Sequence, residues 1–513
     1  MDKVGHVRQK IRTVTELGEI ANDLKRNGET IVLAHGTFDL LHVGHVKHLQ
    51  AARAEGTVLM VTITADEYVV KGPGRPVFSE TLRSEMLASL EYVDYVGIER
   101  SATAKEAIRA IRPSVYVKGA EYEDATQDIT GQIADERQAV ESEGGRISFT
   151  NEETFSSTKL INRYFDIFDP PLQEYLGNLR ARNLGKPLLE AVNTIADLRV
   201  LVVGDAIIDE YVYSSPIGKS PKETIIATLY QDSEEFAGGV LATGNHIANF
   251  CKHVEIVSVL GMHESYEDLI RASLKPNIRF TPLLRPGVPT TRKTRFVEPS
   301  YIRKMFEVYY MDDAPIPTEL EDKLDSLIRE KAPRADLTVV NDFGHGMITP
   351  RIRKALEESA KFLALNTQTN SGNAGYNLVT NYRRADYIAI DAPEARLAAR
   401  NKFGDLGSEV MPAIRSAVNC EHLIVTHGGH GCYVSAKSDP VQHIPAFTKT
   451  VVDTVGAGDA FFAITSPLAS VGIPMELVGV IGNAAGALKV GIVGHRKSIE
   501  KVPLLKYLGT LLK

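Results

Sequence analysis

The chain has 513 residues, of which 43% are hydrophobic and 24% charged; this composition is typical of a water-soluble globular protein with two to four domains and excludes a disordered chain. The net charge of −7, with no Lys/Arg run at either end, argues against nucleic acid or an anionic membrane as a partner. The three cysteines lack paired spacing, so we expect neither a zinc site nor a disulfide framework. We also expect a cytoplasmic protein, because the sequence has no apolar run of about 18 residues and no signal-peptide pattern.

In the first part of the chain, short apolar segments alternate with helical patterns. Ile31–Ala34 reads as a strand that ends in a polar loop, and a helical pattern follows as far as Ala54. Val58–Thr64 and Tyr92–Ile98 read as further strands, with apolar residues at helical spacing between them. Strands that alternate with helices predict a parallel sheet with crossover connections.

The pattern weakens near residue 166, and the proline pair at 170–171 with the polar stretch at 185–187 indicates a joint between modules. Arg199–Val203 then opens a second alternating region that continues to about Gly494. We therefore expect an α/β protein with two doubly wound parallel-sheet (Rossmann-like) domains. The expected divisions are residues 1–165 for the first domain, 166–195 for a linker and 196–513 for the second domain.

The segment Gly36–His45 lies where the first strand meets a helix, which is where open α/β sheets present ligand sites. His42 and His45 are three residues apart, so one helical turn sets both imidazoles on the same side. Two imidazoles beside the free N–H groups of a helix start can stabilise a reacting triphosphate. For an isolated pair, two surface histidines or half of a metal site would be the commoner explanation.

Cationic and hydroxyl residues follow at intervals. The loop Lys71–Val77 with Arg83 is basic, Lys118 ends a strand, and the hydroxyl residues 156–158 open a helix. Each alone is more often a solvated surface or an ordinary helix cap. Together they offer the cations and N–H groups that polyphosphate requires.

From Ile31 to Tyr164 these features resemble the cytidylyltransferase-like nucleotidylyltransferases, whose signature is GxFDxxHxGH. The resemblance implies transfer of a nucleotidyl group from an NTP to a sugar or polyol phosphate, with Mg²⁺ and release of pyrophosphate. It implies catalytic roles for His42, His45, Lys71 and Arg75, nucleotide contacts for Gly36, Thr37, Phe38, Lys118, Ser156, Ser157 and Thr158, and a substrate contact for Asp39.

In the second region, Asp453–Phe461 reads DTVGAGDAF. Its glycines let consecutive N–H groups point at one anion at the start of a helix. We call these N–H groups, at residues 456–458, the nest. Asp459, directly after it, can accept a proton from an attacking hydroxyl. The string resembles the DTxGAGD signature of the ribokinase-like kinases, which implies Asp459 as the base and Gly456, Ala457 and Gly458 as the anion hole.

Further matches arrive in the order of that family, including residues 342–346, which resemble its strand-end D-Y-x-K-G element. The alternating residues Ile225–Tyr230 resemble the lid strand that covers the sugar and forms a dimer contact. The resemblance implies substrate contacts for Asp205, Asp209, Gly238 and Gly239, and nucleotide contacts for Thr426, Gly428, Gly431 and Asn483.

Three departures concern the kinase substrate. Ala242 replaces an asparagine expected after the glycine pair, and residues 366–368 read Asn-Thr-Gln where bifunctional relatives have Asp-Pro-Lys. The Asn-x-x-Glu element linked to Mg²⁺ reads Asp391-Ala392-Pro393-Glu394, and carboxylates there still suit a metal and its waters. Asp391 and Glu394 are therefore expected to act on the metal indirectly.

The two resemblances together match bifunctional heptose-phosphate kinase/nucleotidylyltransferases, with the modules in reversed order. They imply ATP-dependent phosphorylation of a heptose-like sugar phosphate and formation of an ADP-sugar, with Mg²⁺, a monovalent cation and a homodimer. Two alternatives stay open: a CTP-dependent transferase for a polyol or sugar phosphate with altered kinase specificity, and a kinase-like domain that senses sugar phosphates without turnover.

Overall fold

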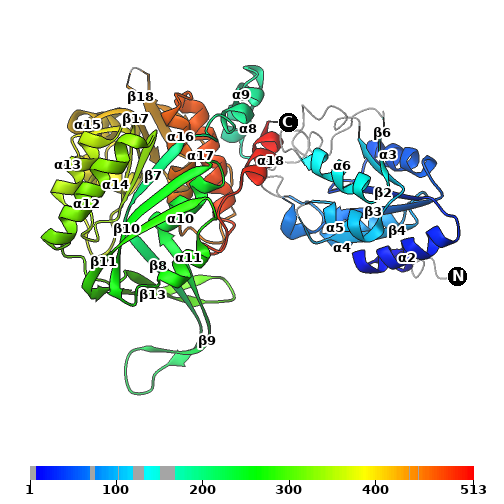
Figure 1. The fold of residues 1–513 in the computed structure, drawn as a ribbon, viewed down its shortest axis with the longest axis horizontal. Coiled ribbons are helices and arrows are strands. Elements are labelled where there is room, and N and C mark those ends of the chain that lie inside the picture. The colour runs from blue at the N-terminus through cyan, green and yellow to red at the C-terminus, as the bar shows by residue number, and fades with distance from the viewer. Residues whose placement is uncertain are drawn as a thin grey trace. The chain divides into compact units, whose positions relative to one another are not determined.

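The structure is a computed structural model that describes residues 7–69, 75–101, 103–119, 132–150, 168–437, 439–448 and 450–512. It divides into two compact units, residues 1–170 with 505–513, and residues 171–504 (Figure 1). Both units are layered α/β structures, as the sequence predicts. The domain boundaries expected from the sequence remain a prediction.

The first unit contains a six-stranded parallel sheet of order β1-β4-β3-β2-β5-β6. Alternate residues of β2 enter different cores: Val32 and Ala34 pack on one side, Ile31 and Leu33 on the other. The strands are β1 Ile11–Arg12, β2 Ile31–Gly36, β3 Val58–Thr64, β4 Tyr95–Glu99, β5 Val115–Gly119 and β6 Arg146–Thr150. The helices are α2 Val14–Arg26, α3 Val43–Ala54, α4 Glu80–Ala88, α5 Lys105–Ile111 and α6 Gln132–Ser142.

The second unit contains a nine-stranded sheet of order β11-β10-β7-β14-β15-β16-β17-β18-β19. Its strands pair in parallel except that β18 is antiparallel to both β17 and β19. Its strands are β7 Arg199–Gly204, β10 His253–His263, β11 Ile278–Pro289, β14 Leu337–Asp342, β15 Leu363–Thr367, β16 Arg384–Asp391, β17 Asn419–Thr426, β18 Cys432–Ala436 and β19 Gln442–Ile444. The helices are α10 Val240–Ala248, α11 Glu267–Ser273, α12 Thr318–Lys331, α13 Pro350–Ser359, α14 Ala392–Ala398, α15 Met411–Ala417, α16 Ala457–Ser470 and α17 Met475–Lys489, and α18 Lys501–Leu511 follows.

A separate four-stranded sheet of order β13-β12-β8-β9 forms a lid beside the main sheet. Its strands are β8 Ala206–Lys219, β9 Ile226–Gly239, β12 Arg292–Glu298 and β13 Arg303–Tyr310. The extra strand expected at Ile225–Tyr230 is confirmed as the start of β9, whose hairpin with β8 reaches away from the main sheet (Figure 1). Asp205 separates β7 from β8, so the chain passes from the main sheet into the lid at a predicted substrate residue.

The stretch expected to be a linker contains two helices, α8 Pro170–Ala181 and α9 Gly185–Ala191. Leu172, Leu176 and Leu179 of α8 are buried at helical spacing. Within the part of the chain that the structure describes, no helix combines the length and the apolar character that crossing a membrane requires.

Candidate active sites

His42 and His45 lie side by side at the start of α3. His42 is the N-cap of the helix, its Nδ1 accepts a hydrogen bond from Gly44 N at 3.1 Å, and the two imidazole rings stack with 3.9 Å between centroids. Burial lowers the pKa of His42, so the ring is neutral at pH 7 and carries its proton on Nε2. The two imidazoles therefore lie together at the start of α3, as the three-residue spacing predicts.

The preceding loop follows the end of β2 at Gly36. Phe38 takes a left-handed conformation with φ 48°, which is uncommon for a residue with a side chain, and its ring lies edge-on to His45 with centroids 5.1 Å apart. The loop thus presents Thr37 and Phe38 directly before the two imidazoles.

Asp39 and Arg75 form a buried ion pair, with Arg75 Nη1 at 3.1 Å from Asp39 Oδ2. The other carboxylate oxygen of Asp39 accepts a hydrogen bond from Val77 N at 2.6 Å. Asp39 therefore holds the end of the basic loop in place, and its substrate contact stays a prediction. Four further predicted residues, Lys71, Ser156, Ser157 and Thr158, lie outside the described residues.

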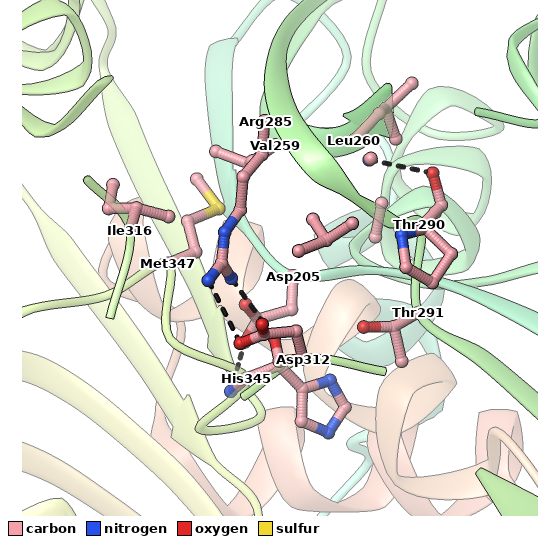
Figure 2. A pocket seen from close by; sticks show the side chains of 14 residues that line it. Asp205, Val259, Leu260, Arg285, Thr290, Thr291, Asp312, Ile316, His345 and Met347 are labelled. Atoms are coloured by element: carbon pink, nitrogen blue, oxygen red, sulfur yellow. Dashed lines mark hydrogen bonds and ion pairs between the residues drawn. The ribbon is translucent and has the colours of Figure 1, made fainter. Parts of the chain in front are cut away.

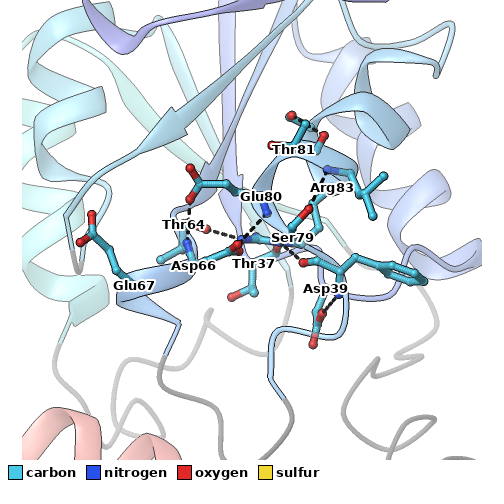
Figure 3. A network of polar contacts seen from close by, with 12 residues as sticks. Thr37, Asp39, Thr64, Asp66, Glu67, Ser79, Glu80, Thr81 and Arg83 are labelled. Carbon is cyan, nitrogen blue, oxygen red and sulfur yellow. Dashed lines mark hydrogen bonds and ion pairs between the residues drawn. The ribbon is translucent and has the colours of Figure 1, made fainter. Parts of the chain in front are cut away.

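Arg83 has a structural role rather than the phosphate contact suggested by its place beside the basic loop (Figure 3). Its side chain is fully buried, and its guanidinium donates to the carbonyl oxygens of Thr37 at 2.6 Å, Phe78 at 3.0 Å and Thr64 at 2.9 Å. It also pairs with Asp66 Oδ1 at 2.6 Å. One side chain thus ties the nucleotide loop to β3 and α4, and this corrects the interpretation drawn from the sequence.

Lys118 at the end of β5 pairs with Glu136 of α6, with 2.9 Å between Nζ and Oε2. The hydroxyl of Tyr116 donates to the same oxygen at 3.1 Å. Burial alone would raise the pKa of Glu136, but the charge of Lys118, the nearby His35 and the hydrogen bonds from Lys118 and Tyr116 together lower it. Glu136 carries no motif and was not identified from the sequence.

In the second unit, the glycine nest opens α16. Gly456 is its N-cap with φ 73°, and an added Cβ there would come within 2.4 Å of His495 Cε1. Ala457, Gly458 and Asp459 form the first turn; Ala457 N donates to Thr454 O at 3.2 Å, so the N–H groups that point out of the helix start are those of Gly458 and Asp459. Burial raises the pKa of Asp459 to about 6, which suits a general base near neutral pH.

Gln368 donates from Nε2 to Asp459 Oδ1 at 3.1 Å. This residue occupies the position where relatives were expected to carry a lysine. An ammonium there would lower the pKa of the carboxylate, whereas an amide supplies a hydrogen bond without charge. The departure seen in the sequence therefore lies in direct contact with the candidate base.

Two side chains contact Asp209: Arg295 of the lid strand β12 and His495 of the loop after α17. His495 Nε2 lies 3.2 Å from Asp209 Oδ2. Burial raises the pKa of this carboxyl, but Arg295 and His495 outweigh it and hold the pKa far below its usual value. Gly238 is required beside it, because a Cβ would stand 2.0 Å from Asp209 Oδ2. Arg295 and His495 were missed because neither belongs to a motif.

Asp205 lines a pocket of about 30 Å³ at the end of β7 (Figure 2). Its Oδ2 accepts a hydrogen bond from Phe343 N at 3.0 Å, and burial together with the nearby Asp342 raises its pKa to about 7. Arg285 also lines the pocket and pairs with Asp312 at 3.0 Å. Polar groups therefore converge beside the predicted substrate carboxylate, and Gly239 at the start of α10 packs against the Asp205 carbonyl oxygen.

The nest is anchored by Asp453, whose carboxylate is fully buried. It pairs with Lys304 of the lid strand β13 at 2.5 Å and accepts from Tyr211 Oη at 2.6 Å and Gly494 N at 2.8 Å. Burial would raise its pKa, but Lys304 and Tyr211 lower it to about 2. The lid and the nest thus share one carboxylate.

The predicted nucleotide contacts lie on neighbouring elements of the second unit. Thr426 ends β17, and Gly428 and Gly431 belong to the turn before β18. Asn483 of α17 donates to the carbonyl oxygens of Ile444 at 3.2 Å and Pro445 at 3.0 Å. These contacts give Asn483 a structural role, and its nucleotide contact remains a prediction.

Asp391 and Glu394 form a capping box at the start of α14. Asp391 Oδ1 accepts from Glu394 N at 2.8 Å, and Glu394 accepts from Asp391 N at 3.1 Å and Thr369 N at 2.9 Å. Burial and the charge of Asp391 raise the pKa of Glu394 to about 8. Within the described residues no cluster of three metal-binding side chains occurs, so the indirect metal role remains a prediction.

Comparison with known proteins finds a different family match in each of the two units. Residues 33–163 match the cytidylyltransferase-like family and residues 351–502 match the pfkB family of carbohydrate kinases. The bifunctional protein HldE of Rhodopseudomonas palustris is 27% identical over 300 residues, which are 58% of this chain and 60% of that protein. HldE of Aliarcobacter butzleri is 45% identical over 144 residues, 28% of this chain and 30% of that protein.

The chain thus spans about three fifths or less of the length of these relatives. Among solved structures, Arabidopsis thaliana ribokinase with ribose and ATP covers 61% of this chain and 99% of its own, with 18% identity and a TM-score of 0.46. Phosphofructokinase-2 of Escherichia coli with potassium covers 62% and 100%, with 13% identity and a TM-score of 0.49. The chain combines an N-terminal cytidylyltransferase-like domain with a C-terminal pfkB carbohydrate kinase domain, the two domain types of HldE-like bifunctional proteins in the opposite order.

Proposed function

We propose that the chain carries two reactions of nucleotide-sugar synthesis. Its C-terminal domain transfers the γ-phosphoryl group of ATP to a hydroxyl of a heptose-like sugar or sugar phosphate. Its N-terminal domain transfers a nucleotidyl group from an NTP to a sugar 1-phosphate, giving an ADP-sugar and pyrophosphate. The resemblance to HldE supports the pairing of these activities.

The observation that carries the kinase proposal is the position of Asp459 directly after the nest at the start of α16. As the acceptor hydroxyl oxygen attacks the γ-phosphorus, its proton passes to the Asp459 carboxylate and the bond to ADP breaks. The main-chain N–H groups stabilise the charge that develops on the transferred group. A carboxyl with a pKa of about 6 is mostly ionised at pH 7 and takes up a proton readily.

Mg²⁺ bound with ATP neutralises phosphate charge in reactions of this class. Both oxygens of Glu394 already accept backbone N–H groups, whereas only one oxygen of Asp391 has such a bond. Asp391 is therefore the better candidate to hold a water of the metal, which fits an indirect role.

In the N-terminal domain, the His42 and His45 imidazoles are suited to stabilising the charge that develops on the α-phosphate oxygens as the sugar phosphate oxygen attacks. The catalytic role expected for Arg75 stays a prediction, because its guanidinium is buried against Asp39. No covalent enzyme intermediate is needed, because positioning and charge stabilisation suffice for in-line transfer. Pyrophosphate leaves with the electron pair of the broken P–O bond.

The test separates the two domains. We expect Asp459→Asn to reduce sugar-dependent ADP formation by about 10²- to 10⁴-fold, because the general base is lost. Pyrophosphate release from NTP and a sugar 1-phosphate should be unchanged in the same variant. Unchanged ADP formation would reject Asp459 as the base, and ADP formation absent from the unmodified chain with every sugar tried would reject the kinase. Pyrophosphate release with ATP and with CTP decides the nucleotide of the N-terminal domain.

A further inference from the structure

A second pocket, with a volume of about 200 Å³, lies beside His495 on the side of α10. One water molecule needs about 10–15 Å³ of volume measured in this way, so the pocket has room for a small ligand. Ala242 contributes a small side chain to its wall, where the family pattern led us to expect an amide. The other lining residues come from the end of β9, from α10, from the end of α11 with the turn that follows it, and from the segment 495–500.

Two histidines in this lining are almost completely buried. His246 is 1% exposed, and its Nδ1 accepts a hydrogen bond from Ile499 N at 2.9 Å. Burial holds its pKa well below the usual value, so the ring is neutral and its proton is on Nε2. The His495 side chain is 6% exposed, and its Nδ1 has no hydrogen-bond partner among the described residues. A buried polar atom without a partner costs about 1–3 kcal/mol, which a ligand atom would offset.

The charged residues of the pocket are mainly cationic: Lys275, Arg496 and Lys497 face a single acid, Glu500. Arg496 is already paired with Glu234 at 2.8 Å. Lys275 and Lys497 have no ion-pair partner in the ranges that the structure describes. Two ammonium groups are thus available to an anion at this pocket.

Both rims of the pocket are fixed to α10 and the residue that follows it. Asn245 donates to Ser273 O at 3.1 Å and accepts from Lys275 N at 2.9 Å. Asn249 donates to Ser498 Oγ at 2.8 Å and to Ile499 O at 2.9 Å. The backbone of each basic segment is therefore held before any ligand arrives, which reduces the entropy lost on binding.

We propose that this pocket binds a phosphate group, which accepts hydrogen bonds from His246 Nε2, Lys275 and Lys497. Because His495 Nε2 faces the Asp209 carboxylate, Nδ1 of the neutral ring is an acceptor, and it takes a hydrogen bond from a P–OH group. A tetrahedral oxyanion can accept hydrogen bonds from several donors at once, and charge-assisted bonds to ammonium groups are strong. The phosphate is either a substituent of the kinase acceptor or free inorganic phosphate. Because His495 also contacts Asp209, occupancy of the pocket is linked to the sugar-binding side of the kinase site.

Binding of inorganic phosphate to the full chain tests the proposal, measured by titration calorimetry with a non-hydrolysable ATP analogue at saturation. We expect Lys275→Glu and Lys497→Glu each to weaken binding tenfold or more. Lys323→Glu makes the same charge change at an exposed residue of α12 and should leave binding unchanged. Equal binding in all four proteins, or equal weakening in all three variants, would overturn the proposal.

Ala242→Leu fills the pocket without changing charge and should abolish phosphate binding. If that buried substitution prevents folding, Lys497→Gln on the exposed rim serves instead, and its expected effect is a several-fold weakening. Phosphate binding retained in a folded Ala242→Leu protein, or unchanged in Lys497→Gln, would place the phosphate elsewhere and reject this site.

Kinase assays with matched acceptors that differ only in a phosphate substituent separate the two sources. A KM raised by Lys497→Glu only for the phosphorylated acceptor identifies a substituent. A KM unchanged for both acceptors, with phosphate binding lost, identifies free phosphate; both results support the site. The titration requires no turnover, so a chain that binds phosphate in this charge-dependent way but consumes no ATP would reject the proposed kinase and leave the pocket intact.

Discussion

The two candidate active sites differ in how they treat buried carboxylates. In the N-terminal domain, Asp39 and Glu136 are each paired with a cation, Arg75 and Lys118. In the C-terminal domain Asp209 is paired in the same way, but Asp459 receives an amide from Gln368. Of these four carboxylates, the three with a cationic partner hold loops or lid strands in place, and Asp459, which lacks one, has a raised pKa. Asp205 and Glu394 also have a raised pKa, so the position of Asp459 at the start of α16 is what distinguishes the candidate base from them.

The largest effect should come from removing a charge-stabilising group that only the N-terminal site uses. We expect His45→Ala to reduce pyrophosphate release about 10²- to 10³-fold while ADP formation by the kinase is unchanged. His48→Ala removes another imidazole of the same helix, which contacts Thr150, and should have a much smaller effect. Similar losses of pyrophosphate release in both variants would mean that the activity depends on the integrity of α3 and not on the imidazole pair.

Arg83→Met tests whether a buried cation in the N-terminal domain is structural. We expect a loss of about 3–5 kcal/mol in the unfolding free energy of that domain, because Asp66 and three carbonyl oxygens lose their donor. Urea denaturation followed by circular dichroism measures it. Arg100→Met removes an exposed pair with Glu80 and should cost at most about 1 kcal/mol. A loss no larger than in Arg100→Met would contradict the structural role.

Gln368→Lys should give Asp459 a cationic partner and so lower its pKa, as in the paired carboxylates. Asp459 is active when ionised, so kcat/KM falls as the pH falls through about 6. A lysine in contact lowers the pKa by about 1–3 units, so activity at pH 5 relative to pH 8 should rise by up to about tenfold. Gln368→Met adds no charge and should not move the acid limb downward. An unmoved limb in Gln368→Lys would show that another group controls the pH profile.

The smallest effect concerns the capping box. Asp391→Ala should lower the stability of the C-terminal domain by about 1 kcal/mol, whereas Asp391→Asn should cost less, because asparagine also caps helices. Thermal unfolding measures both variants. If Asp391→Asn raises the Mg²⁺ concentration that the kinase requires without any loss of stability, Asp391 acts on the metal independently of its cap. Equal stability losses in Asp391→Ala and Asp391→Asn would contradict the capping role.

The fold could be predicted largely because buried parallel strands are continuous apolar runs. Val58–Thr64 matches β3 at both ends, and Arg199–Val203 differs from β7 by one residue. β1 and α2 were not predicted from the sequence, although Thr13 and Glu16 form a capping box that marks the start of α2. A two-residue strand such as β1 carries no periodicity, so only its pairing partner reveals it.

The candidate sites could be predicted where chemistry is local in the sequence. The His42 and His45 pair and the nest before Asp459 are both contiguous motifs, and the structure describes each as a unit. Arg295 and His495 reach Asp209 from residues far along the chain. Contacts of that kind depend on the tertiary fold, so no spacing rule could have found them.

Lys304 has a consequence for protein engineering, because this lid residue supplies the cation for Asp453 at the foot of the nest. A chimera that receives its lid hairpins from another sugar kinase would keep the nest sequence but lose this ammonium unless the donor carries one at the same position. The buried Asp453 carboxylate would then have no cationic partner, and Tyr211 and main-chain N–H groups would be its remaining hydrogen-bond donors. A chimera with an exchanged lid should therefore keep a lysine at the position of Lys304 as long as it keeps Asp453.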